Sequence, residues 1–142
     1  NVNHAILQGL QNTFEATVNS IVKYSWHKKT GAVADSEQMA AYFREKAKQR
    51  MLDAGSKTVH GDFLACSNFD LSARLEEIAV PVLVIASDCD RMVPLKVSRE
   101  MAEKLPNSEF VSLENCGHFQ HIEQTAKVAG ELVTFLSQLR NT

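Results

Sequence analysis

The first half of the chain carries apolar residues at helical spacing. From Ala5 to Trp26 they recur every three or four positions, which predicts one long amphipathic helix; they are Ile6, Leu7, Leu10, Phe14, Val18, Ile21 and Val22. A second helix is predicted from a cap at Asp35 or Ser36 to Gly55, and a shorter one follows from Thr58 to Cys66. We therefore expect this half of the chain to be entirely helical.

The second half alternates between strand and helix patterns. Ala79–Ala86 is a continuous apolar run rich in β-branched residues, typical of a strand buried on both faces of a parallel sheet. A helix opened by Pro94 is predicted to run to Leu105, and a second strand to cover Phe110–Leu113. A last helix is predicted over His121–Leu139. Its inward-facing residues are expected to be Val128, Leu132, Phe135, Leu136 and Leu139. This order predicts an α/β protein with parallel strands.

Two parallel strands do not make a stable sheet by themselves. Strands as apolar as these are usually flanked by further strands and covered by helices on both faces of the sheet. The sequence, however, contains no further convincing strand. We therefore expect the missing strands to precede residue 1 or to come from another chain. Exposed sheet edges and an uncovered face also predict self-association into a homo-oligomer, or pairing with the missing N-terminal part.

Composition narrows the class of protein. The formal net charge of −2 gives no basic footprint for nucleic acid or for an anionic membrane surface. Cys66, Cys89 and Cys116 are odd in number and lack CxxC spacing, which argues against a disulfide framework and fits a reducing cytoplasm. No run of 18 apolar residues is present, so no segment is predicted to span a membrane.

The candidate chemistry follows the two predicted strands. Asp88 and Asp90 come after the first, and Gly117-His118 comes after the second. Catalytic groups collect at the carboxyl ends of parallel strands, where a carboxylate can accept the histidine Nδ1–H and fix its tautomer. A glycine at this turn predicts a positive φ or a close backbone approach.

Simpler roles remain open for these residues. His118 can be a structural turn histidine, and Asp90 can be a helix-capping residue before Pro94. His121 and Glu123 are expected to be surface or capping groups. A zinc site formed by Cys89, Cys116, His118 and His121 matches no common ligand spacing, so neither a metal nor another cofactor is expected.

Three segments carry a resemblance to a known family. "VPVLVIASDCDRMVP" and "AEKLPNSEFVSLENCGHFQHIE", followed by an amphipathic helix, resemble the C-terminal third of an α/β-hydrolase fold protein. "GDFLACSNFDLSARLEEI" resembles the end of the helical cap in esterase-like members. The resemblance covers about residues 58 to 139. The sequence departs from the family pattern at Ser87, where a glycine is usual, and at Glu123-Gln124-Thr125, which lacks a frequent proline.

The resemblance implies a fragment of an α/β-hydrolase fold, with a helical cap over 1–70 and the C-terminal part of the core over 71–142. It implies Asp90 as the acid of a serine–acid–histidine triad and His118 as the general base, acting on a small ester-like substrate without a cofactor. The apolar residues expected to line the substrate pocket are Trp26, Met39, Phe43 and Phe119, although Trp26 can equally anchor the helices and Met39 and Phe43 can be core residues.

The nucleophile of such a triad has no candidate in this sequence. A GxSxG elbow needs two glycines four positions apart, and the glycines at 9, 31, 55, 61, 117 and 130 provide no such pair. We therefore expect the serine to lie upstream of this chain, and the chain alone to be inactive. The alternatives are a non-catalytic ligand-binding module and a self-associating module derived from the same fold.

Overall fold

The computed structural model describes residues 2–27 and 37–140, and the side chains of the second range from residue 40 onward. The described chain forms two compact units. One takes in Asn1–Tyr24 and Ala41–Leu71, and the other takes in Ser25–Ala40 and Ser72–Thr142. No helix in the described ranges is long and apolar enough to cross a membrane.

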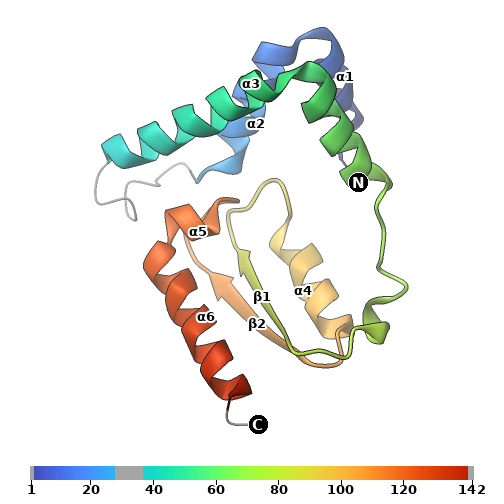
Figure 1. Cartoon of the computed structure of the whole chain (residues 1–142), viewed down its shortest axis with the longest axis vertical. Coiled ribbons are helices and arrows are strands. Elements are labelled where there is room, and N and C mark those ends of the chain that lie inside the picture. Colours follow the sequence, from blue (N-terminus) through green and yellow to red (C-terminus); the bar gives the residue numbers. More distant parts are fainter. Residues whose placement is uncertain (1, 28–36, 141–142) are drawn as a thin grey trace. The chain divides into compact units, whose positions relative to one another are not determined.

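The first unit is helical, as predicted, and contains α1 (His4–Asn12), α2 (Phe14–Ser25) and most of α3 (Glu37–Asn68), which are labelled in Figure 1. The prediction of a single first helix is wrong, because the backbone leaves helical geometry at Thr13 (φ −140°, ψ 53°). The Thr13 hydroxyl donates to the Gly9 carbonyl, and its own carbonyl accepts from Thr17. These side-chain bonds accompany backbone bonds to the same carbonyls, from the Thr13 amide to Gly9 at 2.8 Å and from the Thr17 amide to Thr13 at 3.0 Å.

The interior of the helical unit consists of apolar residues at helical spacing. Leu10, Val18 and Val59 are buried. The predicted helix end at Gly55 is confirmed as a kink inside α3, where Gly55 has φ 80° and ψ 158°. Beside the kink, the Ser56 hydroxyl donates to the Leu10 carbonyl at 2.6 Å and ties α3 to α1. The expected caps Asp35 and Ser36 lie outside the described residues.

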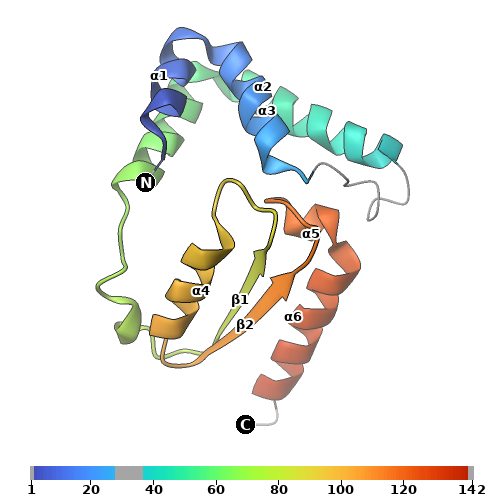
Figure 2. The ribbon, with the colours of Figure 1, turned by 180° about the vertical axis from the view of Figure 1, so that it is seen from behind.

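The second unit contains the parallel strands. After a short 3₁₀ turn, η2 (Leu75–Glu77), it has β1 (Val82–Ser87), α4 (Leu95–Lys104), β2 (Ser108–Leu113), α5 (Gln120–Glu123) and α6 (Thr125–Leu139). The two strands pair in parallel from Val82 opposite Ser108 to Ser87 opposite Leu113. Val84, Ala102 and Leu105 form the core between the strands and α4. Figures 1 and 2 show α4 and α6 on opposite sides of the strand pair.

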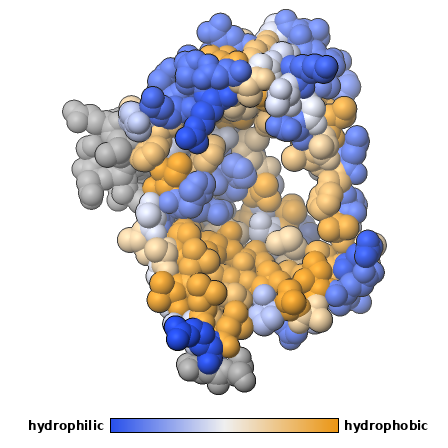
Figure 3. Space-filling view, viewed as in Figure 1, coloured by the Kyte–Doolittle hydropathy of each residue, from blue (hydrophilic) through white to orange (hydrophobic). Residues whose placement is uncertain are grey.

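The last helix differs from its prediction in two ways. It is interrupted at Gln124 (φ −139°, ψ 53°), whose buried side chain donates to the Glu114 carbonyl at 2.6 Å, so α5 and α6 are separate. Its apolar stripe is also not buried: no residue of α6 is fully buried, and Leu136 is 56% exposed. Figure 3 shows hydrophobic residues gathered along α6 and the adjoining sheet.

The exposed stripe on α6 has a simple physical cause. The described ranges contain a sheet of only two strands, which is too narrow to cover the helix. An apolar face of this kind, beside an unpaired strand edge, favours association. Self-association of the chain through this face remains a prediction.

Candidate active site

The parallel pairing brings the two polar turns together. The ladder between β1 and β2 continues past the strand ends, with the Asp88 amide donating to the Leu113 carbonyl at 3.0 Å and the Cys89 amide to the Cys116 carbonyl at 3.1 Å. Both turns thus lie side by side at the carboxyl edge of the sheet, where parallel sheets place their reactive groups.

Asp90 uses its two carboxylate oxygens for different tasks. Oδ1 accepts from the amides of Met92 and Val93 at 2.8 and 2.9 Å, which fixes the turn leading to α4. Oδ2 lies 2.9 Å from Nδ1 of His118. The turn bonds and the histidine contact therefore exist together in one carboxylate, whose side chain is only 4% exposed. The helix cap expected from the sequence is not found, because the N-cap of α4 is Pro94 and no side chain bonds there.

The contact changes the proton affinity of both groups. Burial opposes ionisation of Asp90, but hydrogen bonds from His118, Val93 and Met92 outweigh it and lower the pKa of the carboxyl. The hydrogen bond to Asp90 raises the pKa of His118 above 6.5, against an opposing effect of burial, and the charges of Asp90 and Glu123 add to the rise. With Nδ1 donating to Asp90, the other ring nitrogen of a neutral His118 is a free proton acceptor. The His118 side chain is 38% exposed.

Asp88 makes a different set of contacts. Its Oδ1 lies 3.4 Å from the Cys116 amide. Burial opposes ionisation, yet bonds from Cys89, Asn115 and Cys116 lower the pKa of the Asp88 carboxyl. Asp88 therefore connects the two turns, and the carboxylate that contacts His118 is that of Asp90.

Gly117 is required by a close backbone approach. A Cβ at this position would lie 2.6 Å from the His27 amide nitrogen, 2.9 Å from the Ser25 carbonyl oxygen and 2.7 Å from Oε1 of Glu123. The His118 amide donates to the same Ser25 carbonyl at 2.8 Å. Of the two reasons expected for this glycine, the close approach is found, and the positive φ in the turn belongs to Asn115 (φ 55°).

Replacing Gly117 with alanine is expected to lower the free energy of unfolding by about 3 kcal/mol, because the added methyl group meets backbone atoms that cannot move aside. The matched control is Gly130→Ala in α6, where a Cβ meets nothing within 4 Å and helix propensity predicts a small gain. Urea unfolding of both variants measures the difference. Equal stabilities would contradict the steric explanation.

Glu123 is buried, with 1% of its surface exposed, so the surface position considered from the sequence is wrong. The capping role considered beside it is found, because the carboxylate binds the amide of Phe119, the N-cap residue of α5. Its carboxylate accepts from the amides of His27 and Gly117, both at 3.1 Å, and of Phe119 at 3.2 Å. The local signal was a glutamate in the first turn of a helix, which can reach back to free amides as in a capping box.

The four expected pocket residues are distributed unevenly. Trp26 is buried and its ring centroid lies 5.0 Å from that of Phe119, which in turn lies edge-on to His118 at 5.7 Å. Phe43 belongs to the helical unit, where it is half-buried and packs edge-on against Tyr42. The side chain of Met39 lies outside the described residues. Only Trp26 and Phe119 are thus seen to join the His118 cluster.

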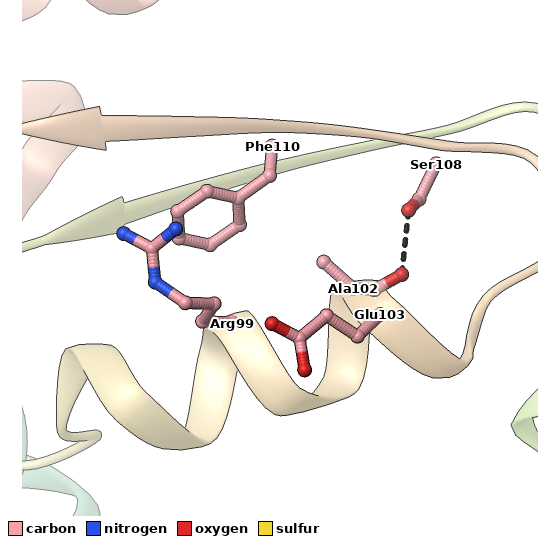
Figure 4. Close-up of a pocket in the computed structure, with 5 residues that line it drawn as sticks. All are labelled: Arg99, Ala102, Glu103, Ser108 and Phe110. Carbon is pink, nitrogen blue, oxygen red and sulfur yellow. Dashed lines mark hydrogen bonds between the residues drawn. The ribbon is translucent and has the colours of Figure 1, made fainter.

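A separate cavity of about 190 Å³ lies between α4 and β2. Figure 4 shows its lining residues: Arg99, Ala102, Glu103, Ser108 and Phe110. The Arg99 guanidinium lies 4.6 Å from the centre of the Phe110 ring, and the Ser108 hydroxyl donates to the Ala102 carbonyl. This cavity shares no residue with the Asp90–His118 pair.

Comparison with known proteins gives a consistent family. The family model described as "alpha/beta hydrolase fold" matches residues 3–125. RutD of Pseudomonas syringae pv. syringae (strain B728a), provisionally named a carbamate hydrolase, is 41% identical over 73 residues, covering 51% of this chain and 28% of its own length. The 2-hydroxy-6-oxononadienedioate/2-hydroxy-6-oxononatrienedioate hydrolase of Paraburkholderia phymatum is 41% identical over 69 residues, covering 49% and 24%.

A solved structure extends the likeness to nearly the whole chain. The structure of a thermophilic esterase superposes with a TM-score of 0.80 and 28% identity, covering 96% of this chain and 51% of that protein. The chain thus spans about half of this solved structure and less than a third of the two sequence relatives.

Proposed function

Because this chain belongs to the alpha/beta hydrolase fold family, we propose that it contributes the acid and the histidine of a serine hydrolase active site. The 2.9 Å contact between Asp90 Oδ2 and His118 Nδ1 is the observation that carries the proposal. The substrate is a small carboxylic ester or a related carbonyl compound. The names of the three similar proteins all describe hydrolysis, which supports the reaction class.

The chemistry requires a serine from sequence outside these 142 residues. Nε2 of His118 takes the serine proton while the serine oxygen attacks the carbonyl carbon. The resulting imidazolium gives that proton to the leaving alcohol as the ester C–O bond breaks. Water then attacks the acyl-enzyme while His118 takes its proton. The proton passes to the serine oxygen as the acyl–serine bond breaks, which releases the carboxylic acid product and restores the serine hydroxyl. Asp90 holds Nδ1–H in place and stabilises the imidazolium in both steps.

The helical unit is proposed to be the cap of this hydrolase. Within the second unit, Trp26 and Phe119 beside His118 supply apolar side chains for an acyl or alkyl group.

The test is a pH series on the complete gene product that contains this sequence, with p-nitrophenyl acetate and butyrate as substrates. His118 must be neutral to accept the serine proton, and its pKa is raised. We therefore expect kcat/KM to rise with pH through a midpoint above the ordinary histidine value of 6.5. A phosphonate ester should label one serine per protein and stop turnover. Failure to hydrolyse either ester and to react with the phosphonate would contradict the proposal.

A further inference from the structure

We propose that Glu123 is the positioning residue of His118: its buried carboxylate holds the backbone on both sides of the histidine and anchors it to the segment Ser25–His27. This inference rests on the proposed function, because it names how the same site is held. It adds a fourth side chain that contacts neither the substrate nor the reacting atoms.

The hydrogen bonds of Glu123 surround the histidine in sequence. Oε2 accepts from the Gly117 amide, one residue before His118, and Oε1 accepts from the Phe119 amide, one residue after it. The backbone is therefore fixed on either side of the residue that must hold its ring toward Asp90. A carboxylate is suited to this task, since it is an acceptor at both oxygens.

The same carboxylate reaches a distant segment. Oε2 also accepts from the His27 amide, and the His118 amide donates to the Ser25 carbonyl at 2.8 Å. The ring of Trp26, between these two residues, stacks near Phe119. The His118 loop is thus held from two directions, and the absence of a side chain at Gly117 is what lets the three segments meet.

The substitution Glu123→Gln tests the hydrogen bonds and the charge of Glu123 separately from the size of its side chain. It keeps the size of the side chain, but only one of its two terminal atoms accepts. Whichever way the amide is turned, its NH₂ group faces at least one backbone N–H, so at least one of the three bonds is lost. The substitution also removes a negative charge that helps raise the pKa of His118.

The first measurement uses the complete gene product without any substitution. The amides of His27, Gly117 and Phe119 are expected to exchange slowly with solvent in NMR hydrogen exchange, as slowly as amides of β1. Fast exchange at these three amides would overturn the proposal without any question of a misfolded variant.

The second measurement compares Glu123→Gln with Glu114→Gln, a matched charge change on an exposed glutamate in the turn after β2. An NMR titration of the His118 ring should show a lower pKa in Glu123→Gln and no change in Glu114→Gln. The charged groups that act on His118 are Asp90 and Glu123, while the Cys89 and Cys116 thiols lie near Glu123. An unchanged His118 titration in Glu123→Gln would count against the proposal.

The third measurement is kinetic and uses the complete gene product. Glu123→Gln should lower kcat roughly 10- to 100-fold with little change in KM, because the base is misplaced while substrate contacts remain. Glu123→Asp keeps the charge with a shorter reach, so it should lower kcat while leaving the His118 pKa raised. Hydrolysis in which Glu123→Gln equals Glu114→Gln would overturn this inference alone. Slow amide exchange and a shifted His118 titration in a protein that hydrolyses no ester would overturn the proposed function alone.

Discussion

Replacing His118 with alanine is expected to lower kcat by a factor on the order of 10⁴ to 10⁶ in the complete gene product. The variant has no group that can take the serine proton or return it to the leaving alcohol, whereas Asp90 stays in its turn through the amides of Met92 and Val93. The measurement is hydrolysis of p-nitrophenyl butyrate at saturating substrate, with unfolding followed by circular dichroism to show that the fold is retained.

The control for this experiment is His121→Ala. His121 is three positions further along the chain, in α5, and its side chain is exposed, whereas the bond to Asp90 comes from His118. It should keep activity within a few-fold of the unchanged protein. If His118→Ala retained most of its turnover while His121→Ala lost it, the histidine would have been assigned wrongly.

Asp90→Asn should lower kcat by a factor on the order of 10⁴. The amide can keep the turn by accepting from Met92 and Val93 through its oxygen, which leaves its NH₂ group facing Nδ1 of His118. The imidazole must then carry its proton on Nε2, the nitrogen that has to act as the base. Loss of the carboxylate also removes the main cause of the raised His118 pKa, so the titration of His118 moves to lower pH.

Asp88→Asn is the matched control, because it makes the same chemical change two residues earlier in the same turn. Asp88 contacts the Cys116 amide and not the histidine, so its variant should retain activity within a few-fold. Comparable losses in both variants would show that the negative charge of the turn matters in general, and that Asp90 has no special part as the orienting acid.

The strands and the contact between Asp90 and His118 were predictable because their signals are local. A β-branched apolar run marks β1, and polar turns follow both strands at the edge where parallel sheets place their ligands. The sequence did not decide between capping and histidine contact for Asp90, since both readings fit the same residue. In the structure one carboxylate oxygen accepts from turn amides before α4 and the other contacts His118, while α4 itself has no side-chain cap.

The features that were missed depend on distant or competing interactions. The backbone leaves helical geometry at Thr13 and at Gln124, and apolar spacing does not report such single-residue breaks. At Gln124 the side chain bonds to the Glu114 carbonyl, outside the helix. The burial of Glu123 depends on a segment 96 residues away. The exposed stripe of α6 looked inward-facing because the pattern shows that a helix has an apolar side and does not show what covers it.

The bonds between Ser25–His27 and the His118 loop also bear on the order of folding. β1, α4 and β2 are contiguous in the chain and can form their contacts early, whereas the bond from His27 to Glu123 must close a loop of 96 residues. The entropy of closing such a loop grows slowly with its length, by about 0.6 kcal/mol for each doubling. Insertions or deletions in the helices between His27 and Glu123 should therefore change the entropic cost of this loop closure only slightly. Because the closure spans so many residues, the geometry around His118 should be among the last parts of the second unit to form.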